Sequence, residues 1–289
     1  MQPVFLALIR CGSGANSFST GGTMLIKDRD SRDGTIEQLR GLLSLNLSPQ
    51  KKFLIERELK NISPGDDGGK NAARFINFYC ADTRNWAIIH DLKIQDNGSS
   101  TQIDHILINQ FFDIYLVESK NYTYSLKITA DGEFLVFDGR KFQSVESPIE
   151  ENQKRIQALR KTLAENKIIP KRLGIPVRPK IKPYVLVSSA ANVLRPPKSV
   201  YDTSSIVTAD YLTQTLLKRV ERLKRFHQKL KRLPKAFNSH TLEKAAAKLA
   251  SLNAPGTVDY GRLFCCGEPG VKSIDRPARD ISAYSDFAI

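Results

Sequence analysis

The chain has 289 residues, 41% hydrophobic and 26% charged, with a formal net charge of +14 and a pI of about 9.6. This composition is that of a soluble globular protein, and no run approaches the about eighteen apolar residues that a membrane span needs. The four cysteines, Cys11, Cys80, Cys265 and Cys266, show neither a disulfide framework nor CxxC zinc spacing, which fits a reducing, cytoplasmic location. The positive charge favours an anionic partner, and nucleic acid is the leading candidate.

Two segments precede the main part of the chain. Residues 1–23 include a short apolar run that lacks the features of a signal peptide, and we expect these residues to be a disordered leader. Residues 34–61 carry apolar side chains at helical spacing, with a break at Ser48-Pro49. They therefore predict two helices, a helical extension that packs on the main domain.

A glycine-rich segment follows at residues 63–69, directly before a helical pattern at 71–76. We expect a turn that leads into a helix. Such a turn is able to hold a phosphate at the helix N-terminus. This one lacks a Lys-Ser/Thr ending and carries Asp66 and Asp67, so we exclude a nucleotide-binding loop.

Residues 85–120 predict three strands of a sheet. A strand over 85–94 is followed by the turn signal Asp-Asn-Gly-Ser at 96–99, and two further strands cover 102–108 and 113–120. We expect His90 to be structural. His105 points away from the face that carries Asp104, so we interpret it as packed or hydrogen-bonded support.

Charged side chains stand on an otherwise apolar face of the last two strands, far from their turn. Gln102 and Asp104 share this face on one strand, and Glu118 and Lys120 share it on the other. Two adjacent buried carboxylates repel each other, and a divalent cation with hard oxygen ligands relieves that repulsion. The pattern suits metal-assisted phosphodiester hydrolysis, with a surface Asp–Lys salt bridge as the alternative.

The motifs Gln-Ile-Asp-His at 102–105 and Val-Glu-Ser-Lys-Asn at 117–121 resemble the nuclease-related domain (NERD) family. The resemblance covers roughly residues 62–215 and extends more weakly from Met24 to about residue 250, which makes Met24 a candidate natural start. It implies a PD-(D/E)xK restriction-endonuclease-like fold. It also implies that Asp104 and Glu118 bind Mg²⁺ or Mn²⁺ and that Lys120 is the catalytic lysine.

Three positions depart from the family pattern. The family motif GxxGE places a glutamate where Gly69 stands, and the family often has histidine at the position of Arg155. The missing acid leaves open whether the site is active. Glu151 stands where the family has a glutamine, and we expect it to support the site together with Gln102. Stabilisation of a helix N-terminus by Glu151 is an equal alternative.

The remaining elements alternate between strands and helices. We expect strands at 124–129, 133–138, 141–145, 184–188 and 205–207, and helices from 148, from 209 and over 241–251. The tail from residue 254 resembles a degenerate zinc ribbon. Because it holds only the adjacent Cys265 and Cys266, we expect no structural zinc.

A basic segment lies between these last helices. Residues 218–235 hold nine basic residues and a single acidic one, and their leucines keep helical spacing. Contact with a nucleic-acid backbone and a solvated helix face are equally weighted interpretations. The candidate contact residues are Lys218, Arg219, Arg222, Arg225, Lys229 and Arg232.

The sequence thus predicts an α/β fold, a mixed central sheet flanked by helices. We expect a nuclease-like domain over 62–215, a helical extension over 24–61, a basic helical extension over 216–253 and a tail over 254–289. The predicted function is Mg²⁺- or Mn²⁺-dependent hydrolysis of phosphodiester bonds in DNA, in DNA processing. We expect nucleic acid as the partner and no membrane partner. Two alternatives remain: a nucleic-acid-binding module with a degenerate site, and an interaction domain on the same scaffold.

Overall fold

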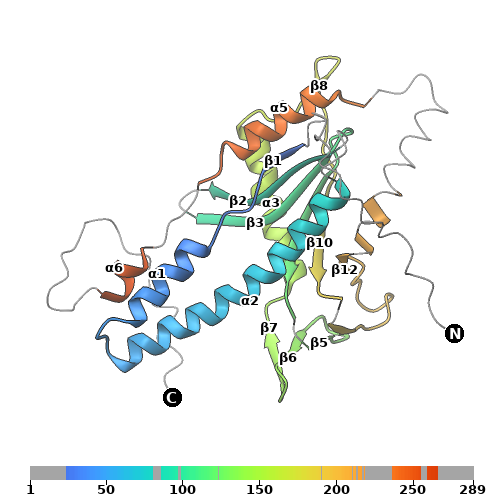
Figure 1. Cartoon of the computed structure of the whole chain (residues 1–289). Coiled ribbons are helices and arrows are strands. Elements are labelled where there is room, and N and C mark those ends of the chain that lie inside the picture. Colours follow the sequence, from blue (N-terminus) through green and yellow to red (C-terminus); the bar gives the residue numbers. More distant parts are fainter. Residues whose placement is uncertain are drawn as a thin grey trace, which may run out of the picture.

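The centre of the protein is a mixed sheet of six strands in the order β1-β2-β3-β4-β10-β12 (Figure 1). The computed structural model describes residues 24–80, 86–96, 99–122, 124–189, 191–209, 211–212, 214–216, 218, 236–254 and 259–265. The strands of the sheet are β1 (Leu25–Lys27), β2 (Trp86–Asp96), β3 (Ser99–Asn109), β4 (Ile114–Lys120), β10 (Ile181–Val187) and β12 (Ile206–Thr208).

Strands β2, β3 and β4 form two successive antiparallel pairs, and all other neighbours in this sheet are parallel. Ile106 lies opposite Leu116 and Ile108 opposite Ile114, so the two apolar runs share one face as their alternation predicts. The three strands expected over residues 85–120 are therefore confirmed. Asn109 closes the second pair, because its side-chain oxygen accepts hydrogen bonds from the backbone of Phe111 and Asp113.

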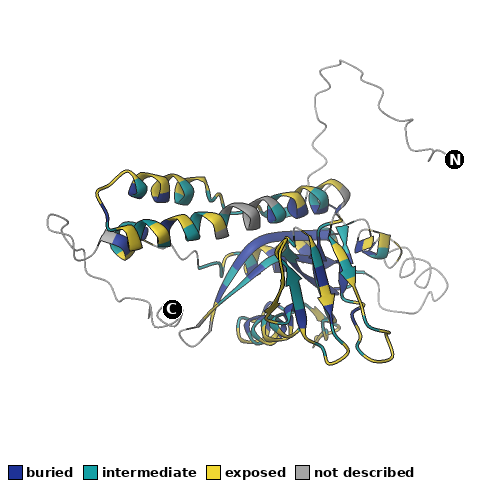
Figure 2. Cartoon of the chain, turned by 90° about the horizontal axis from the view of Figure 1, so that it is seen from below, coloured by how far each residue is buried: buried dark blue, intermediate teal, exposed yellow. Residues whose placement is uncertain are grey.

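Helices cover both faces of this sheet, which confirms the expected fold class (Figure 1). One face packs against α3 (Pro148–Glu165) and α5 (Ser239–Ala250) through residues such as Leu159 and Ala246. The other face packs against α2 (Pro49–Cys80) through Ala72 and Ile76. Figure 2 shows the buried residues concentrated on the sheet between these layers.

Helix α2 runs without interruption for 32 residues, so the expected glycine-rich turn at 63–69 is wrong. Its first half packs with α1 (Asp33–Leu43) and α6 (Tyr260–Cys265) around Ile55, and its second half packs on the sheet. Packing at both ends outweighs the about 1 kcal/mol of helix propensity that each interior glycine costs. The same helix crosses the expected boundary between residues 61 and 62.

Gly68 allows α2 to approach the end of β4 closely. A Cβ atom at this position would lie 2.9 Å from Cβ of Asn121, the residue that directly follows β4. Real Cβ atoms do not pack at this separation, so the contact requires glycine. Gly68, which the sequence predicted to lie in a turn, therefore lies inside a helix and allows it to pack closely against Asn121.

Residues 25–27 form strand β1, although the sequence placed them in a helical extension. Strand β1 pairs in parallel with β2, and the backbone N–H of Ile88 donates to the carbonyl of Met24 at 2.9 Å. Three residues are too few for a periodic pattern to reveal a strand. The two helices expected over 34–61 are confirmed as α1 and the start of α2.

A second, smaller sheet has the order β11-β5-β6-β7. It contains the expected meander of β5 (Ser125–Ile128), β6 (Phe134–Phe137) and β7 (Phe142–Val145), joined by β11 (Asn192–Leu194). Strands β8 (Lys171–Arg172) and β9 (Ile175–Pro176) form a separate hairpin. Within the described ranges, no helix is both long and apolar enough to cross a membrane.

The contact at Gly68 generates a prediction about stability. Gly68→Ala should lower the free energy of unfolding by about 1 kcal/mol or more, because the new methyl group overlaps Asn121. Gly41→Ala is the control, since nothing lies within 4 Å of its Cβ position in α1, and it should stabilise by about 0.5–1 kcal/mol. Urea unfolding measures both, and equal stabilisation would contradict the close approach of α2 to β4.

Candidate active site at the open end of the central hairpin

Strands β3 and β4 bring Asp104 and Glu118 together at the end of the hairpin far from its turn. Glu118 is 6% exposed, and Asp104 is half-buried. The backbone N–H of Ser119 donates to Oδ2 of Asp104 at 2.9 Å, which ties the Asp104 carboxylate to the strand that carries Glu118. The neighbouring carboxylates predicted from side-chain alternation are therefore present in the structure.

Helix α3 completes the site with Glu151 and Arg155. Nζ of Lys120 lies 2.8 Å from Oε2 of Glu151 and 3.7 Å from Oε1 of Glu118. Arg155 bridges the same two carboxylates, with Nη2 at 3.1 Å from Glu118 and Nη1 at 3.2 Å from Glu151. The five residues predicted for the site thus lie together. Gln102 joins them through its backbone carbonyl, which accepts from Nε of Arg155 at 2.9 Å.

The position of Glu151 follows from the way α3 begins. Ser147 caps the helix by accepting from the backbone N–H of Glu150, and Pro148 occupies its first turn. Glu151 in that first turn and Arg155 one turn later face the sheet together. Arg155 is the member of the network to which the sequence assigned no role.

Burial and charge repulsion set the proton affinity of the two carboxylates on the hairpin. Burial, followed by repulsion from Asp104, raises the pKa of Glu118 from its ordinary value of 4.5 to about 8, although Arg155 and Lys120 oppose the change. Burial also raises the pKa of Asp104, against the N–H of Ser119 and the charge of Arg155. Oε2 of Glu118 is buried without a hydrogen-bond partner. The positive charges of Arg155 and Lys120 therefore do not fully offset the burial and mutual repulsion of Asp104 and Glu118.

The pKa of Glu151 is shifted in the opposite direction. Its burial favours a higher pKa, but hydrogen bonds and charge from Lys120 and Arg155 together lower the pKa below its ordinary value. Tyr122, two residues beyond Lys120, has its pKa raised to about 12 by burial and then by Glu151 and Glu118. Glu151 is thus the ionised anchor of the network, and Tyr122 stays a neutral phenol beside it.

Asp104 and Glu118 fit a hard divalent cation. They offer carboxylate oxygens, one of which is buried and without a partner, and oxygen is the donor that Mg²⁺ and Mn²⁺ prefer. Within the described residues, no group of three or more His, Cys, Asp or Glu side chains is arranged to hold a metal. Two carboxylates completed by water and substrate phosphate are the usual set for Mg²⁺.

Two buried histidines connect the site hairpin to α2 from the other face of the sheet. Nε2 of His90 lies 3.0 Å from Oδ1 of Asn77, and Nδ1 of His90 lies 2.8 Å from Nδ1 of His105. Nε2 of His105 lies 2.9 Å from Oγ of Ser119. Burial lowers the pKa of both rings to about 3, so both are neutral. The supporting role expected for His105 is confirmed.

Neutral rings give this row of hydrogen bonds a single direction. Because Oδ1 of Asn77 accepts, Nε2 of His90 carries the proton and Nδ1 of His90 accepts from His105. Nε2 of His105 then accepts from the hydroxyl of Ser119. Ser119 therefore links the histidine pair to Asp104, since its backbone N–H is the donor to that carboxylate.

Arg29 lies where a side chain at residue 69 would point. A Cβ atom on Gly69 would be 3.0 Å from Nη2 of Arg29, and Nε of Arg29 is 3.3 Å from Oδ2 of Asp91. Asp91 lies between His90 and Leu92, whose partners His105 and Ile103 flank Asp104 on β3, and it has a φ of 47°. Burial raises the pKa of Asp91, while Arg29 opposes this and Asp104 adds to it.

The sequence missed Asp91 as a neighbour of the site. Its position as a charged residue between His90 and Leu92 in an apolar strand was the available signal. The side chains of Asp66 and Asp67 lie outside the described residues, as do residues 1–23 and Cys266. Of the six predicted nucleic-acid contacts only Lys218 is described, and it is exposed. The other five lie outside the described residues: Arg219, Arg222, Arg225, Lys229 and Arg232.

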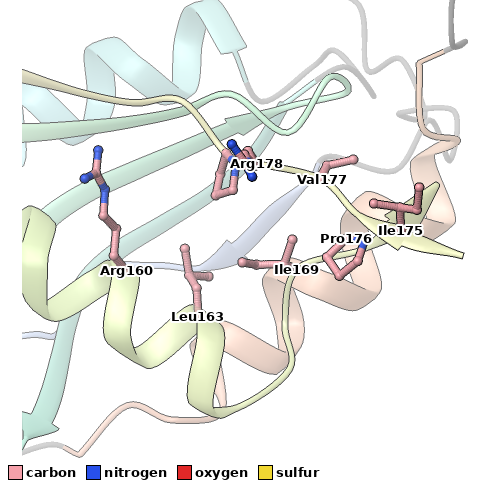
Figure 3. A pocket seen from close by; sticks show the side chains of 8 residues that line it. Arg160, Leu163, Ile169, Ile175, Pro176, Val177 and Arg178 are labelled. Carbon is pink, nitrogen blue, oxygen red and sulfur yellow. The ribbon is translucent and has the colours of Figure 1, made fainter.

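Two cavities lie near α3 and α2. The larger, about 490 Å³, is formed by α3, the β8–β9 hairpin and the segment up to β10. Figure 3 shows Arg160 and Leu163 on α3 facing it, and it shares no residue with the carboxylate network. The smaller, about 240 Å³, is lined in part by Ser119, Lys120 and Asn121 and therefore adjoins the candidate site.

One family of known proteins is similar to part of this chain. The model of a family described as Nuclease-related domain (NERD) matches residues 64–188. This range contains Asp104, Glu118, Lys120 and α3, so the family resemblance is confirmed for the part of the chain that carries the site. No curated protein and no solved structure matches the chain.

The raised pKa of Glu118 predicts how stability depends on pH. Between about pH 4.5 and 8 the folded state keeps a proton that the unfolded state has lost, so stability falls as pH rises, by up to about 1.4 kcal/mol per unit. Glu118→Gln removes this titration. Its stability relative to the unchanged chain should rise by on the order of 3–4 kcal/mol between pH 5 and pH 8, measured by urea unfolding without divalent cations.

The exposed Glu150 on α3 provides the control for this measurement. Glu150→Gln should leave the slope of stability against pH unchanged. An unaltered slope in Glu118→Gln would show that the Glu118 carboxylate titrates normally and would contradict its desolvation.

The histidine row gives a separate prediction. Ser119→Ala removes the donor to Nε2 of the buried His105 and should cost about 1–3 kcal/mol of stability. Ser144→Ala, at an exposed position of β7, should change stability by less than about 0.5 kcal/mol. Thermal unfolding compares the two, and equal small effects would argue against the hydrogen bond.

Proposed function

We propose that this chain, which matches the nuclease-related domain over residues 64–188, is a Mg²⁺- or Mn²⁺-dependent nuclease that hydrolyses phosphodiester bonds in DNA. One observation carries the proposal. Glu118 is a buried carboxylate next to Asp104, it has a pKa of about 8, and one of its oxygens has no hydrogen-bond partner. Such a pair is costly to the fold unless a cation binds there.

Asp104 and Glu118 would hold the metal, which when bound would activate water and neutralise charge on the phosphate. Glu118 carries a proton at neutral pH, and its carboxyl group would release that proton to solvent when a cation is bound there. Arg155 holds one oxygen of Glu118 in place, so the partnerless oxygen keeps its position. These residues set the geometry of the site before substrate arrives.

Lys120 contacts the substrate in this proposal. Its ammonium group orients the attacking water and stabilises negative charge on the phosphate. Glu151 positions that ammonium at 2.8 Å, and because its own pKa is lowered it stays ionised during the reaction. The side chain of Lys120 is 27% exposed, so it reaches the solvent from which a phosphodiester would approach.

The net charge of +14 supports a nucleic-acid substrate, because phosphate contacts by Lys and Arg provide most of such affinity. We include the basic segment 218–235 as a backbone contact. A cytoplasmic location is part of the proposal. Cys80 is a buried cysteine, and burial raises the pKa of its thiol to about 12.

A second candidate function is nucleic-acid binding without cleavage. Gly69 provides no carboxylate, and the guanidinium of Arg29 fills the space in front of it. An added positive charge there weakens the attraction of a cation to this side of the site. In this alternative the ion pairs of Arg155 and Lys120 with Glu118 are the final state of the site.

Cleavage of supercoiled and linear DNA with Mg²⁺ or Mn²⁺ separates the two functions. The unchanged chain should nick DNA, and Glu118→Gln should lose at least about a hundredfold in rate, because it removes a proposed metal ligand. Glu150→Gln is the control and should cleave normally. Binding of DNA by all three proteins without cleavage would establish the second candidate, and equal cleavage by all three would place the activity elsewhere.

A further inference from the structure

The smaller cavity lies at the carboxyl ends of the parallel strands β4 and β10. Lys120 is the last residue of β4 and pairs in register with Val187 at the end of β10, and both residues line the cavity. Helix α2 forms the opposite wall through Gly68, Asn71, Ala72 and Phe75. Open α/β sheets bind ligands at the carboxyl ends of their strands. The cavity is therefore placed to receive a part of whatever Lys120 contacts.

The lining of this cavity combines one aromatic ring, short neutral polar side chains and a single cation. Phe75 is half-buried, and Lys120 is the only charged residue among the lining residues. Amide and hydroxyl groups come from Asn71, Asn121, Ser188 and Ser189. A flat ring with hydrogen-bonding edges, joined to an anionic group, matches this set of side chains.

We propose that this cavity binds one unpaired nucleobase of the substrate strand, next to the phosphate held at Lys120. The base stacks on Phe75, and the asparagine and serine side chains hydrogen-bond to its edges. This inference rests on the proposed function. It adds that the substrate presents a single-stranded segment, or at least one unpaired nucleotide, at the point of cleavage.

The size of the cavity supports a single base. Its volume of about 240 Å³ is below the roughly 300–1,000 Å³ of sites for drug-sized ligands. A base pair does not enter a space of this size, whereas a base rotated out of its stack does. The wall is also fixed in place, because Gly68 brings α2 to within contact of Asn121, and the lining residues Ala72 and Val187 are themselves buried.

Binding of fluorescent oligonucleotides in EDTA tests the inference without cleavage. The full chain should bind a single strand more tightly than a duplex of the same length. Phe75→Ala should weaken single-strand binding by roughly tenfold or more, because it removes the stacking surface. Phe78→Ala is the matched control, since Phe78 lies on the same helix, is 75% exposed and does not line the cavity.

An abasic oligonucleotide identifies the group that binds. When the base at the best-bound position is removed, the unchanged chain should lose about as much affinity as Phe75→Ala loses, and the two changes together should lose little more. Ser189→Tyr gives an independent variant that fills the cavity from an exposed position and should weaken single-strand binding while leaving thermal stability unchanged. Its result does not depend on the packing of Phe75.

The inference is overturned if the duplex binds as tightly as the single strand, if Phe75→Ala and Ser189→Tyr bind normally, or if abasic strands lose nothing. Failure of the proposed function is a different result. In that case the chain binds single strands through the cavity but Mg²⁺ and Mn²⁺ produce no cleavage. Metal-dependent cleavage of duplex DNA that is indifferent to Phe75→Ala would keep the nuclease and remove the base site.

Discussion

The burial of Glu118 beside Asp104 is the constraint on which the rest of the site depends. The two carboxylates lie at the ends of apolar strands, where they repel each other and are poorly solvated. Arg155 contacts only one oxygen of Glu118, and the other oxygen has no hydrogen-bond partner. Arg155 is in turn held by Gln102 and Glu151, and Glu151 positions Lys120. The unfavourable pair thus accounts for the Glu151 and Arg155 side chains on the first turns of α3, whereas Ser147 and Pro148 determine where that helix begins.

The two faces of the hairpin carry different kinds of interaction, ion pairs on one face and hydrogen bonds between neutral groups on the other. On one face lie the ionisable residues, whose protonation depends on one another. On the opposite face, His90 and His105 are neutral and bond in one direction from Ser119 to Asn77. Ser119 joins the two, since its hydroxyl belongs to the histidine row and its N–H to Asp104. The residue between Glu118 and Lys120 therefore keeps the acidic pair aligned without taking part in its charge.

Strand alternation was enough to predict the hairpin, its shared face and the meeting of Asp104 with Glu118 and Lys120, because local period determines which side chains are neighbours. The roles of Arg155 and Arg29 were not predictable in this way. They depend on the packing of α3 on the sheet and on the pairing of β1 with β2, which join residues far apart in sequence. Gly68 and Gly69 led to the wrong prediction of a turn, because glycine is required both in tight turns and where two segments approach closely.

The continuity of α2 has a consequence for how this chain tolerates changes in length. One rigid helix carries Ile55 in the α1–α6 cluster and Ala72 and Ile76 on the sheet. Inserting or deleting one residue between these contacts would rotate one cluster by about 100° relative to the other and shift it by about 1.5 Å. The spacing between the two halves of α2 is therefore as restricted as the identity of its buried residues, and homologous chains should vary in α2 by substitution rather than by length.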